Sequence, residues 1–344
     1  MLSKKEIEEV REHLEKAQNP IFFYDNDADG LCSFILLKKF LGRGKGVAVR
    51  SYPDLNASYA RKVKELGADY VFVLDKPIIS KDFVKELDEM QIPFVWIDHH
   101  KMERDWKPEE FSQAWIYNSF SGKGGEPVTF ICYNISEREE DLWVAVMGCI
   151  ADHYMPSFAE KFGENNPSFW GKVKEPFEAY YKTEIGKIAL ALNFGLKDCT
   201  TNIVKMQNFL VSCRGPEEVF LETTENATFR HKYSEIKKKY NSLLERAEKH
   251  GKMVILEYGG ELSISSELSN ELSFYHPDKL IVVVYRKGTL SNISIRGKNA
   301  KKILEKVLKD LKGASGGGHE EAVGARIRTE DLATFKKALE GEIE

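Results

Sequence analysis

A run of alternating carboxylates, DNDADG, places Asp25, Asp27 and Asp29 directly before Gly30. This much negative charge in one short turn is unfavourable unless a cation neutralises it, so the segment predicts a metal site. A calcium loop of the EF-hand type begins in the same way, but it needs a glutamate at its twelfth position and a helix before it. The twelfth position here is Leu36 and an apolar strand precedes the loop, which excludes the EF-hand.

A second cluster, Asp98, His99 and His100, follows another apolar segment. Imidazole combined with carboxylates favours Mn, Fe or Zn over the all-oxygen sites of Mg and Ca. Adjacent side chains at the end of a strand point in different directions, so we expect one histidine to bind metal and the other to face the substrate. With Asp75 and Asp152 as further carboxylates, the set predicts a two-metal site for phosphoryl transfer, open at a solvent-facing sheet edge.

A third segment, GGGH, comprises Gly316, Gly317, Gly318 and His319. Consecutive glycines let backbone N–H groups approach an anion closely, and the histidine can donate to a phosphate oxygen. The segment lacks the Lys and Ser/Thr of a P-loop, which argues against nucleoside-triphosphate hydrolysis. A plain flexible turn is an equal alternative for the glycines alone. Arg296, in SISIRG, is a candidate for a second phosphate contact.

The elements that must position these groups alternate between short apolar strands and helices. Strands are predicted at 21–24, 70–74 and 93–97, and helices over 31–41 and 81–90. The pattern is typical of an α/β fold with a buried parallel sheet. Each strand ends in acidic or histidine residues, and ligands bind at that edge of such sheets. An aspartate after a strand is often only a helix cap, but three such sites favour a functional edge.

The remainder of the chain is predicted to be helical first and then mixed. An apolar helix over 141–151 ends at Asp152, residues 157–228 are mostly helical, and 229–250 read as one long amphipathic helix. Strands and helices alternate again after residue 251, with a last helix over 330–340. The basic face of the long helix, together with aromatic residues such as Tyr233 and Tyr240 of the same helix, could follow a nucleic-acid strand, although most basic faces are only solvated.

Composition narrows the class of protein. The chain has 344 residues, 42% hydrophobic and 30% charged, which is typical of a soluble globular protein of about two domains. The longest apolar run, 280–285, is too short to span a membrane, and the polar N-terminus does not read as a signal peptide. The net charge of −4 provides no general basic field for nucleic acid. Five scattered cysteines without CxxC spacing argue against a zinc ribbon or disulfides and favour the cytoplasm.

These segments resemble the DHH phosphoesterase superfamily, in particular its archaeal RecJ-like branch with a C-terminal DHHA1 domain. The signature segments, in order, are DNDADG, VFVLD, VWIDHH and GCIAD, followed by SISIRG and GGGHEEAVGARI. The resemblance implies a parallel-sheet DHH catalytic domain at 1–156 and a smaller mixed α/β DHHA1 substrate-binding domain at 251–344. Residues 157–250 match nothing beyond a helical connector.

The resemblance also implies roles for individual residues. The metal ligands would be Asp27, Asp29, Asp75, His99 and Asp152. Asp75 would bridge two Mn²⁺ ions, for which Mg²⁺ or Co²⁺ can substitute. Asp98 would orient the site and His100 would face the scissile phosphate. The residues implied to hold a phosphate of the nucleotide strand are Arg296, Gly316, Gly317, Gly318 and His319.

One position departs from the family pattern. Many relatives carry a histidine four residues before Asp27, where this chain has Phe23. Asp25 is placed to compensate for the missing imidazole, so the metal affinity of one of the two positions is expected to differ from that of relatives.

The activity implied is a Mn²⁺-dependent exonuclease that acts on single-stranded DNA, RNA or short oligonucleotides and releases mononucleotides, with 3′→5′ polarity favoured. A role in DNA repair and a helicase or replisome partner are in keeping with such a nuclease, and no membrane partner is expected. The first alternative is a phosphoesterase for small nucleotides, such as pAp, dinucleotides or cyclic dinucleotides. The second is a catalytically weak replication or repair scaffold.

Overall fold

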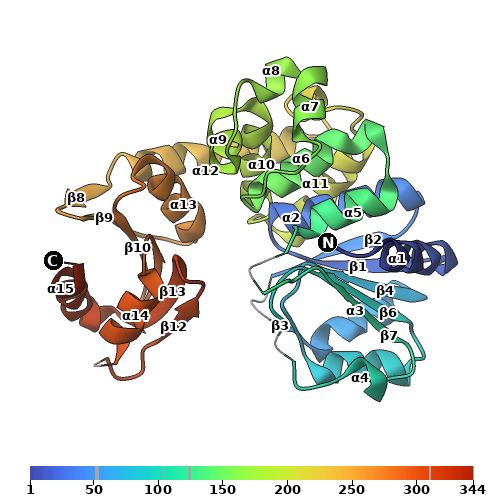
Figure 1. Cartoon of the computed structure of the whole chain (residues 1–344), viewed down its shortest axis with the longest axis horizontal. Coiled ribbons are helices and arrows are strands. Elements are labelled where there is room, and N and C mark those ends of the chain that lie inside the picture. Colours follow the sequence, from blue (N-terminus) through green and yellow to red (C-terminus); the bar gives the residue numbers. More distant parts are fainter. Residues whose placement is uncertain (51–53, 103, 123–124, 310, 344) are drawn as a thin grey trace. The chain divides into compact units, whose positions relative to one another are not determined.

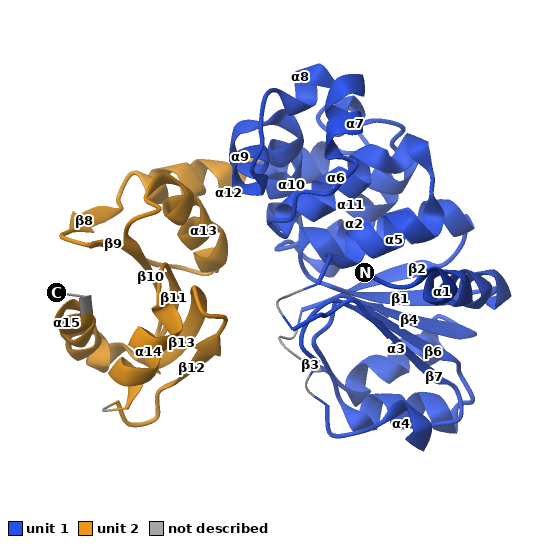
Figure 2. Ribbon diagram, in the orientation of Figure 1, with its two compact units in different colours: residues 1–233 blue, residues 234–344 orange. Residues whose placement is uncertain are grey.

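The structure, a computed structural model, describes residues 1–50, 54–102, 104–122, 125–309 and 311–343. It contains two compact units, Met1–Tyr233 and Ser234–Glu344, which are coloured separately in Figure 2. Each unit has its own sheet. The division of the chain at residues 156 and 250 stays a prediction.

The first unit is built on a five-stranded sheet in which every strand is parallel to its neighbours (Figure 1). The strands, in spatial order, are β2 (Lys45–Val49), β1 (Pro20–Asp25), β4 (Tyr70–Leu74), β6 (Phe94–Asp98) and β7 (Ala114–Asn118). The three predicted strands are β1, β4 and β6, and they lie next to one another. The edge strands β2 and β7 were not predicted, because their apolar runs are short and only partly buried.

Helices cover both faces of this sheet. Figure 1 shows α2 (Ala28–Leu41), α5 (Val128–Ser136) and α6 (Leu142–Ala151) on one side and α3 (Ala60–Glu65) and α4 (Lys81–Glu89) on the other. Side chains of β1 alternate between the two faces, as a pleated strand requires. Phe22 and Tyr24 pack on Phe34 of α2, whereas Phe23 packs edge-on against Phe83 of α4.

Further elements complete the first unit. They are α1 (Lys4–Lys16), the paired short strands β3 (Asp54–Leu55) and β5 (Ile78–Ile79), and the helices α7 (Ala159–Asn165), α8 (Pro167–Trp170), α9 (Pro176–Lys182), α10 (Glu184–Gly195) and α11 (Thr200–Ser212). The helices α7 to α11 confirm the helical character predicted for residues 157–228.

α2 ends at Gly42, whose φ of 72° is the left-handed conformation that glycine adopts without strain.

The second unit is a six-stranded mixed sheet with helices packed on it. Its strands, in spatial order, are β12 (Ser315–Gly318), β13 (Ala322–Arg328), β11 (Leu290–Arg296), β10 (Leu280–Lys287), β9 (Met253–Gly259) and β8 (Glu248–His250). Its helices are α13 (Ser265–Tyr275), α14 (Ala300–Leu308) and α15 (Leu332–Ile343). β10 and β11 pair in the antiparallel sense.

The long connecting helix is shorter than predicted. α12 spans Ala227–Leu244, and the chain then forms β8, which pairs with β9. The aromatic residues on this helix are also not available to a nucleic-acid strand. Tyr240 is fully buried and donates its hydroxyl to Glu271, and the half-buried Tyr233 stacks on Phe220.

The structure also describes the state of the cysteines and the length of the apolar helices. All five cysteines are free thiols. Within the described residues, no helix combines the length and the apolar character needed to cross a bilayer.

Candidate metal centre

The predicted metal ligands lie at the carboxyl ends of three adjacent parallel strands. Asp25 ends β1, Asp75 follows β4, and Asp98 ends β6. The chain moves from β1 outward to β2 and then returns to β4 on the other side of β1, so β1 and β4 flank a topological switch point. Open α/β sheets bind their ligands in the crevice at such a point. Asp152, directly after α6, joins the cluster.

Ligand atoms in this region gather in three overlapping groups, each with its atoms within 4.8 Å of one another. The groups are Asp29–His99–Asp152, Asp75–His99–His100 and Asp25–Asp27–Asp75. All six residues predicted as metal ligands therefore come together. The mixture of imidazole nitrogens and carboxylate oxygens is the donor set that Mn, Fe and Zn prefer.

The first loop is held by backbone contacts at the start of α2. Asp27 caps this helix by accepting a 2.9 Å hydrogen bond from the N–H of Gly30. A side chain at Gly30 would place its Cβ 2.5 Å from the carbonyl oxygen of Asp25, so only glycine allows this close approach. The glycine of DNDADG is thus required by the close packing of the start of α2 against Asp25, and not by the geometry of a calcium loop.

Asp29 has a second function besides its place among the ligands. Its two carboxylate oxygens accept hydrogen bonds from the N–H groups of Val128 and Thr129, at 2.9 and 2.8 Å. These donors open α5, so the carboxylate also caps that helix and is fixed in position. The helix-cap alternative raised for these aspartates is correct for Asp27, which caps α2, whereas Asp29 caps a helix far along the chain. Capping is compatible with metal binding because each oxygen has a second lone pair.

Asp75 has the most central position. It is almost fully buried, and its Oδ1 lies 3.3 Å from Nε2 of His99 and 3.6 Å from Nδ1 of His100. Oδ1 of Asp75 and Oδ2 of Asp98 are buried and accept no hydrogen bond from the residues that the structure describes. Buried carboxylate oxygens normally have partners, and a cation at this point would provide one. The residues present therefore fit a divalent ion.

The two histidines of the DHH segment differ in environment. His99 is 10% exposed and faces Asp75 and Asp152, whereas His100 is 31% exposed and is held by Asp98, whose Oδ1 is 3.0 Å from Nδ1 of the ring. Asp98 itself is fully buried, so the expectation that it lies on a solvent-facing edge is wrong. Its place at the end of a central strand, covered by its neighbours, is the reason.

The charges in the cluster shift one another's ionisation. Burial and the carboxylates of Asp25 and Asp29 raise the pKa of Asp27 to about 7. Burial and the charge of Asp29 raise the pKa of Asp152 to about 8, and burial with the neighbouring aspartates raises the pKa of Asp75 well above its usual range. Raised carboxyl pKa values of this kind are expected where several carboxylates lie close together without a cation to neutralise them.

The pKa of His100 moves in the direction that favours the charged ring. Burial alone would lower it, but the hydrogen bond to Asp98 and the surrounding carboxylates outweigh burial and raise the pKa to about 9. At neutral pH the ring is therefore protonated and can donate from both nitrogens.

The candidate phosphate-binding residues meet at one end of the second sheet. Arg296 on β11 is in register with Ala322 on β13, and the backbone of His319 forms a tight turn with Ala322. Nε of Arg296 donates to Asn270 at 2.7 Å, which fixes the guanidinium plane. The glycines are neither a loop nor a flexible turn: Gly316–Gly318 lie in β12, the exposed edge strand, because they pair with β13.

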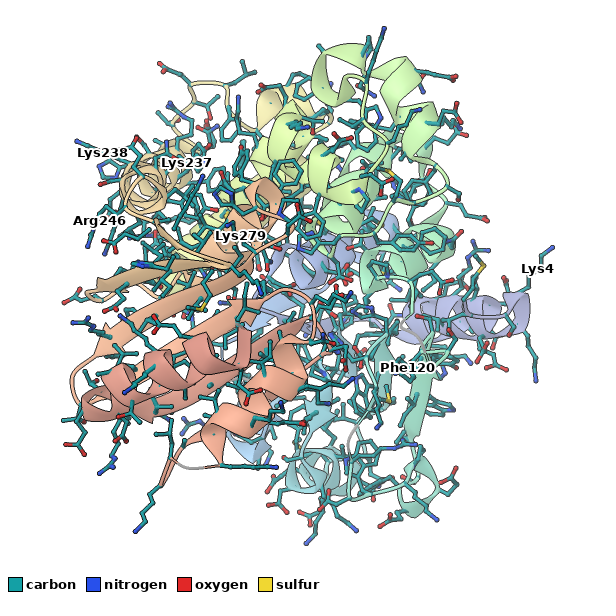
Figure 3. The ribbon with its side chains drawn as sticks, turned by 60° about the vertical axis from the view of Figure 1, so that its left-hand side comes forward. Lys4, Phe120, Lys237, Lys238, Arg246 and Lys279 are labelled. Carbon is teal, nitrogen blue, oxygen red and sulfur yellow. The ribbon has the colours of Figure 1, made fainter. Side chains whose placement is uncertain are left out.

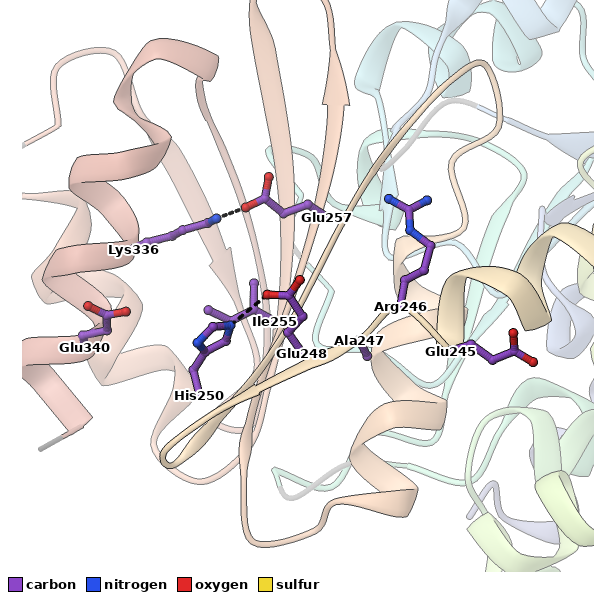
Figure 4. A pocket seen from close by; sticks show the side chains of 9 residues that line it. All are labelled: Glu245, Arg246, Ala247, Glu248, His250, Ile255, Glu257, Lys336 and Glu340. Atoms are coloured by element: carbon purple, nitrogen blue, oxygen red, sulfur yellow. Dashed lines mark hydrogen bonds and ion pairs between the residues drawn. The ribbon is translucent and has the colours of Figure 1, made fainter.

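Two other features of the second unit carry charge. A pocket beside β8, β9 and α15 contains none of the predicted phosphate-binding residues (Figure 4). Its acidic side chains are partly neutralised within the pocket, where Lys336 pairs with Glu257 and His250 pairs with Glu248. Figure 3 shows basic side chains on the same unit, namely Lys237, Lys238, Arg246 and Lys279.

Comparison with protein families agrees with these motifs. A model described as the DHH family N-terminal domain matches residues 21–150, and one described as the DHHA1 domain matches residues 250–344. The chain joins a DHH domain to a DHHA1 domain. The DHH match includes the DNDADG and DHH segments, and the DHHA1 match includes Arg296 and the glycine strand.

Solved structures show that the fold is shared at low sequence identity. RecJ of Thermus thermophilus in complex with Mn²⁺ is 15% identical, with a TM-score of 0.65 over 98% of this chain and 54% of that one. An exonuclease RecJ bound to manganese is 16% identical, with a TM-score of 0.64 over 99% and 95% of the two chains. This chain thus spans about half the length of the Thermus protein. No curated protein matches the sequence significantly.

The first unit contains supporting residues that the sequence analysis did not identify. Asn193 of α10 accepts a 2.9 Å hydrogen bond from the N–H of Ala28, the residue after Asp27, and donates to the hydroxyl of Tyr180. Lys76, which follows Asp75, lies 2.8 Å from Asp25 through its ammonium nitrogen. The sequence indicates a possible role for Lys76 only through its position next to Asp75. It gives no indication for Asn193, because the residue that it supports, Ala28, is 165 positions away.

We expect Asn193→Ala to weaken metal binding about tenfold, because the change frees the loop that carries Asp27 while leaving every ligand in place. The turnover number at saturating Mn²⁺ should change less than threefold. Titration of the metal-free protein with Mn²⁺ measures the affinity. Asn202→Ala is the matched control, since Asn202 bonds Asp198 just before α11; an equal loss of affinity in both variants would contradict this function of Asn193.

Proposed function

We propose that this chain is a divalent-metal-dependent phosphodiesterase that removes mononucleotides from the end of single-stranded DNA, RNA or short oligonucleotides. The observation that carries the proposal is the set of three ligand groups that overlap at Asp75 and His99, directly beside the Asp98–His100 pair. Paired metal positions next to a protonated histidine suit the hydrolysis of an anionic phosphodiester. The polarity we favour is 3′→5′.

Manganese is the metal we propose, on two grounds. The donor set combines histidine nitrogen with carboxylate oxygen, which suits Mn²⁺ better than the all-oxygen sites typical of Mg²⁺. Two structures that share this fold are titled as RecJ with Mn²⁺ and as an exonuclease RecJ bound to manganese. Another solved RecJ is titled as a complex with Mg²⁺, so Mg²⁺ belongs in the same assays.

The residues that would hold the metal are Asp25, Asp27, Asp29, Asp75, His99 and Asp152. When bound, divalent ions would supply Lewis-acid stabilisation of the phosphoryl oxygens and activation of water. The chain's own contribution is His100. Its Nδ1 is fixed on Asp98, so Nε2 would be the ring nitrogen directed to the scissile phosphate. The surrounding carboxylates raise the pKa of the metal-free ring to about 9, and a ring that keeps this proton would donate a charge-assisted hydrogen bond.

The DHHA1 domain would supply substrate binding through Arg296 and the edge strand β12. We expect Arg296→Ala to raise KM about tenfold or more while kcat changes less than threefold, because a charge-assisted hydrogen bond to a phosphate is worth about 1.5–3 kcal/mol. Steady-state kinetics on a labelled oligonucleotide measure both constants. Asn270→Ala should produce a smaller rise in KM, since it only loosens the guanidinium. An equal fall in kcat would place Arg296 at the transition state instead.

The proposed function is tested with end-labelled single strands of 2 to 30 nucleotides, both DNA and RNA, incubated with Mn²⁺ and with His100→Ala as a control. A ladder that shortens from one end of long strands supports the exonuclease and gives polarity and sugar preference. Cleavage confined to the shortest oligomers would replace it with a small-nucleotide phosphoesterase. No cleavage by a protein that binds no Mn²⁺ would replace it with a scaffold.

A further inference from the structure

The three ligand groups of the DHH domain are not equivalent. Two of them contain His99, whereas the Asp25–Asp27–Asp75 group contains no imidazole. Phe23 occupies the strand position two residues before Asp25, and its ring is buried in the core against Tyr59 and Phe83. This side of the cluster therefore has carboxylates only.

A lysine ammonium already occupies this side of the cluster. The side chain of Lys76 is fully buried, and its Nζ lies 2.8 Å from Oδ1 of Asp25. Lysine is almost never fully buried unless its charge is paired, so the contact with Asp25 is part of the reason that this residue can be here. Its position is fixed from behind, because its carbonyl accepts a 2.9 Å hydrogen bond from the indole of Trp96 in the core.

The ammonium and a divalent ion would share one carboxylate, that of Asp25. Asp25 belongs to the ligand group and is also the ion-pair partner of Lys76. A positive charge a few ångströms from a cation site opposes cation binding, and it does so strongly where water is excluded. The Asp29–His99–Asp152 group includes an imidazole, and Nε2 of this imidazole lies 3.3 Å from Oδ1 of Asp75, which belongs to the acidic group.

We propose that Lys76 is a built-in cation that weakens the Asp25–Asp27–Asp75 position, so that the chain binds one divalent ion tightly at Asp29, Asp75, His99 and Asp152 and a second ion at least tenfold more weakly. The inference rests on the metal-dependent function proposed above and specifies how the two positions differ in affinity for the ion. At low metal concentration, Lys76 then contributes the positive charge that a second ion would otherwise provide.

The test is a count of bound ions, which does not depend on hydrolysis. Metal-free full-length protein is titrated with Mn²⁺, and free Mn²⁺ is measured by its electron paramagnetic resonance signal. The wild type should bind one ion tightly and a second at least tenfold more weakly. Because two neighbouring ions also repel each other, Lys76→Met is required to assign the difference: it should tighten the weak position at least tenfold and change the tight position less than threefold.

Two further variants complete the design. Lys76→Arg keeps the charge and should retain the wild-type pattern, and Lys38→Met removes a half-buried lysine that bonds Gly44 and should change neither position. Lys76→Gln replaces the Met variant if circular dichroism shows that the latter does not fold. Two equally tight ions in the wild type, or an unchanged weak position in the uncharged variants, would overturn the inference while leaving the proposed function intact. A wild type that binds no ion would overturn both.

Discussion

His100→Ala is expected to lower kcat about 10³-fold while Mn²⁺ affinity changes less than threefold. The effect is large because His100 is the residue whose protonated ring would meet the charge that develops on the phosphate, and one such donor is worth about 10²–10³ in rate. We expect metal binding to persist because Nδ1 of this ring is bonded to Asp98, and because the Asp29–His99–Asp152 and Asp25–Asp27–Asp75 groups do not include His100. Single-turnover kinetics and a metal titration on the same preparation measure the two effects.

The contrast with neighbouring positions makes this result specific. His99→Ala should lose metal affinity and turnover together, and Asp98→Asn should lower kcat less than His100→Ala because it only disturbs the ring's orientation and charge. His276→Ala, in the second unit, is the control for loss of an imidazole and should leave kcat unchanged. Turnover close to the wild type in His100→Ala would exclude the DHH segment as the reaction centre.

The central part of the candidate site could be predicted because parallel strands bring their carboxyl ends to one edge. Once 21–24, 70–74 and 93–97 were read as neighbouring strands, the residues after them had to meet. The structure places them as predicted, with Asp75 close to both histidines. Burial was harder to predict: the position of Asp98 at a strand end gave no sign that neighbouring elements cover it completely.

What the sequence could not provide were contacts made by pairs far apart in the chain. Asn193 supports the first loop from a helix that matches no motif, and Lys76 pairs with a residue 51 positions earlier. The same limitation explains the end of α12. Its amphipathic pattern continues to Ala247, but pairing of β8 with β9 begins at Glu248 and ends the helix. A local pattern cannot register a partner strand that follows later.

The glycine segment shows the limitation in another form. GGG carries no strand preference, and both alternatives considered for it were loops. Its conformation is decided by β13, whose alternating Val323, Ala325 and Ile327 are buried against the core while its backbone pairs with Gly316–Gly318. The glycines therefore form an exposed strand edge, and unpaired backbone N–H groups are common at such an edge.

Asp75→Asn should abolish metal-dependent turnover and yet stabilise the metal-free protein. Asp75 belongs to two of the three ligand groups, and loss of one member of a catalytic unit typically costs about 10⁴-fold in kcat. Without metal, burial and the neighbouring aspartates make the ionised form of this carboxyl unfavourable and raise its pKa well above the usual range. Asparagine removes that charge, and it tolerates the positive φ of 60° at this position, so the backbone is not strained.

The pH dependence follows from the raised pKa values in the cluster. Asp27 and Asp152 have pKa values of about 7 and about 8 in the folded chain, and the pKa of Asp75 is well above its usual range, whereas all three are near 4 when unfolded. Between these limits the folded chain binds more protons than the unfolded chain, so the free energy of unfolding of the metal-free protein falls as pH rises from about 4 to about 8. Divalent ions bind only the folded cluster and should reverse this loss.

The difference in Tm between Asp75→Asn and the wild type should therefore depend on pH. In the presence of a chelator at pH 8, Asp75→Asn should raise Tm by about 2–4 °C, the shift that about 1 kcal/mol produces in a domain of this size. At pH 5 a larger share of the wild-type carboxyl is protonated, because burial and the neighbouring aspartates raise its pKa, so the difference between the two Tm values should be smaller. Asp69→Asn is the matched control, because Asp69 lies before the opposite end of β4 and accepts the N–H groups of Gln18 and Asn19. Its Tm should not rise at pH 8 and its turnover should stay near that of the wild type. A lower metal-free Tm at pH 8 in Asp75→Asn would show that the cluster is held by its own contacts and does not require a cation.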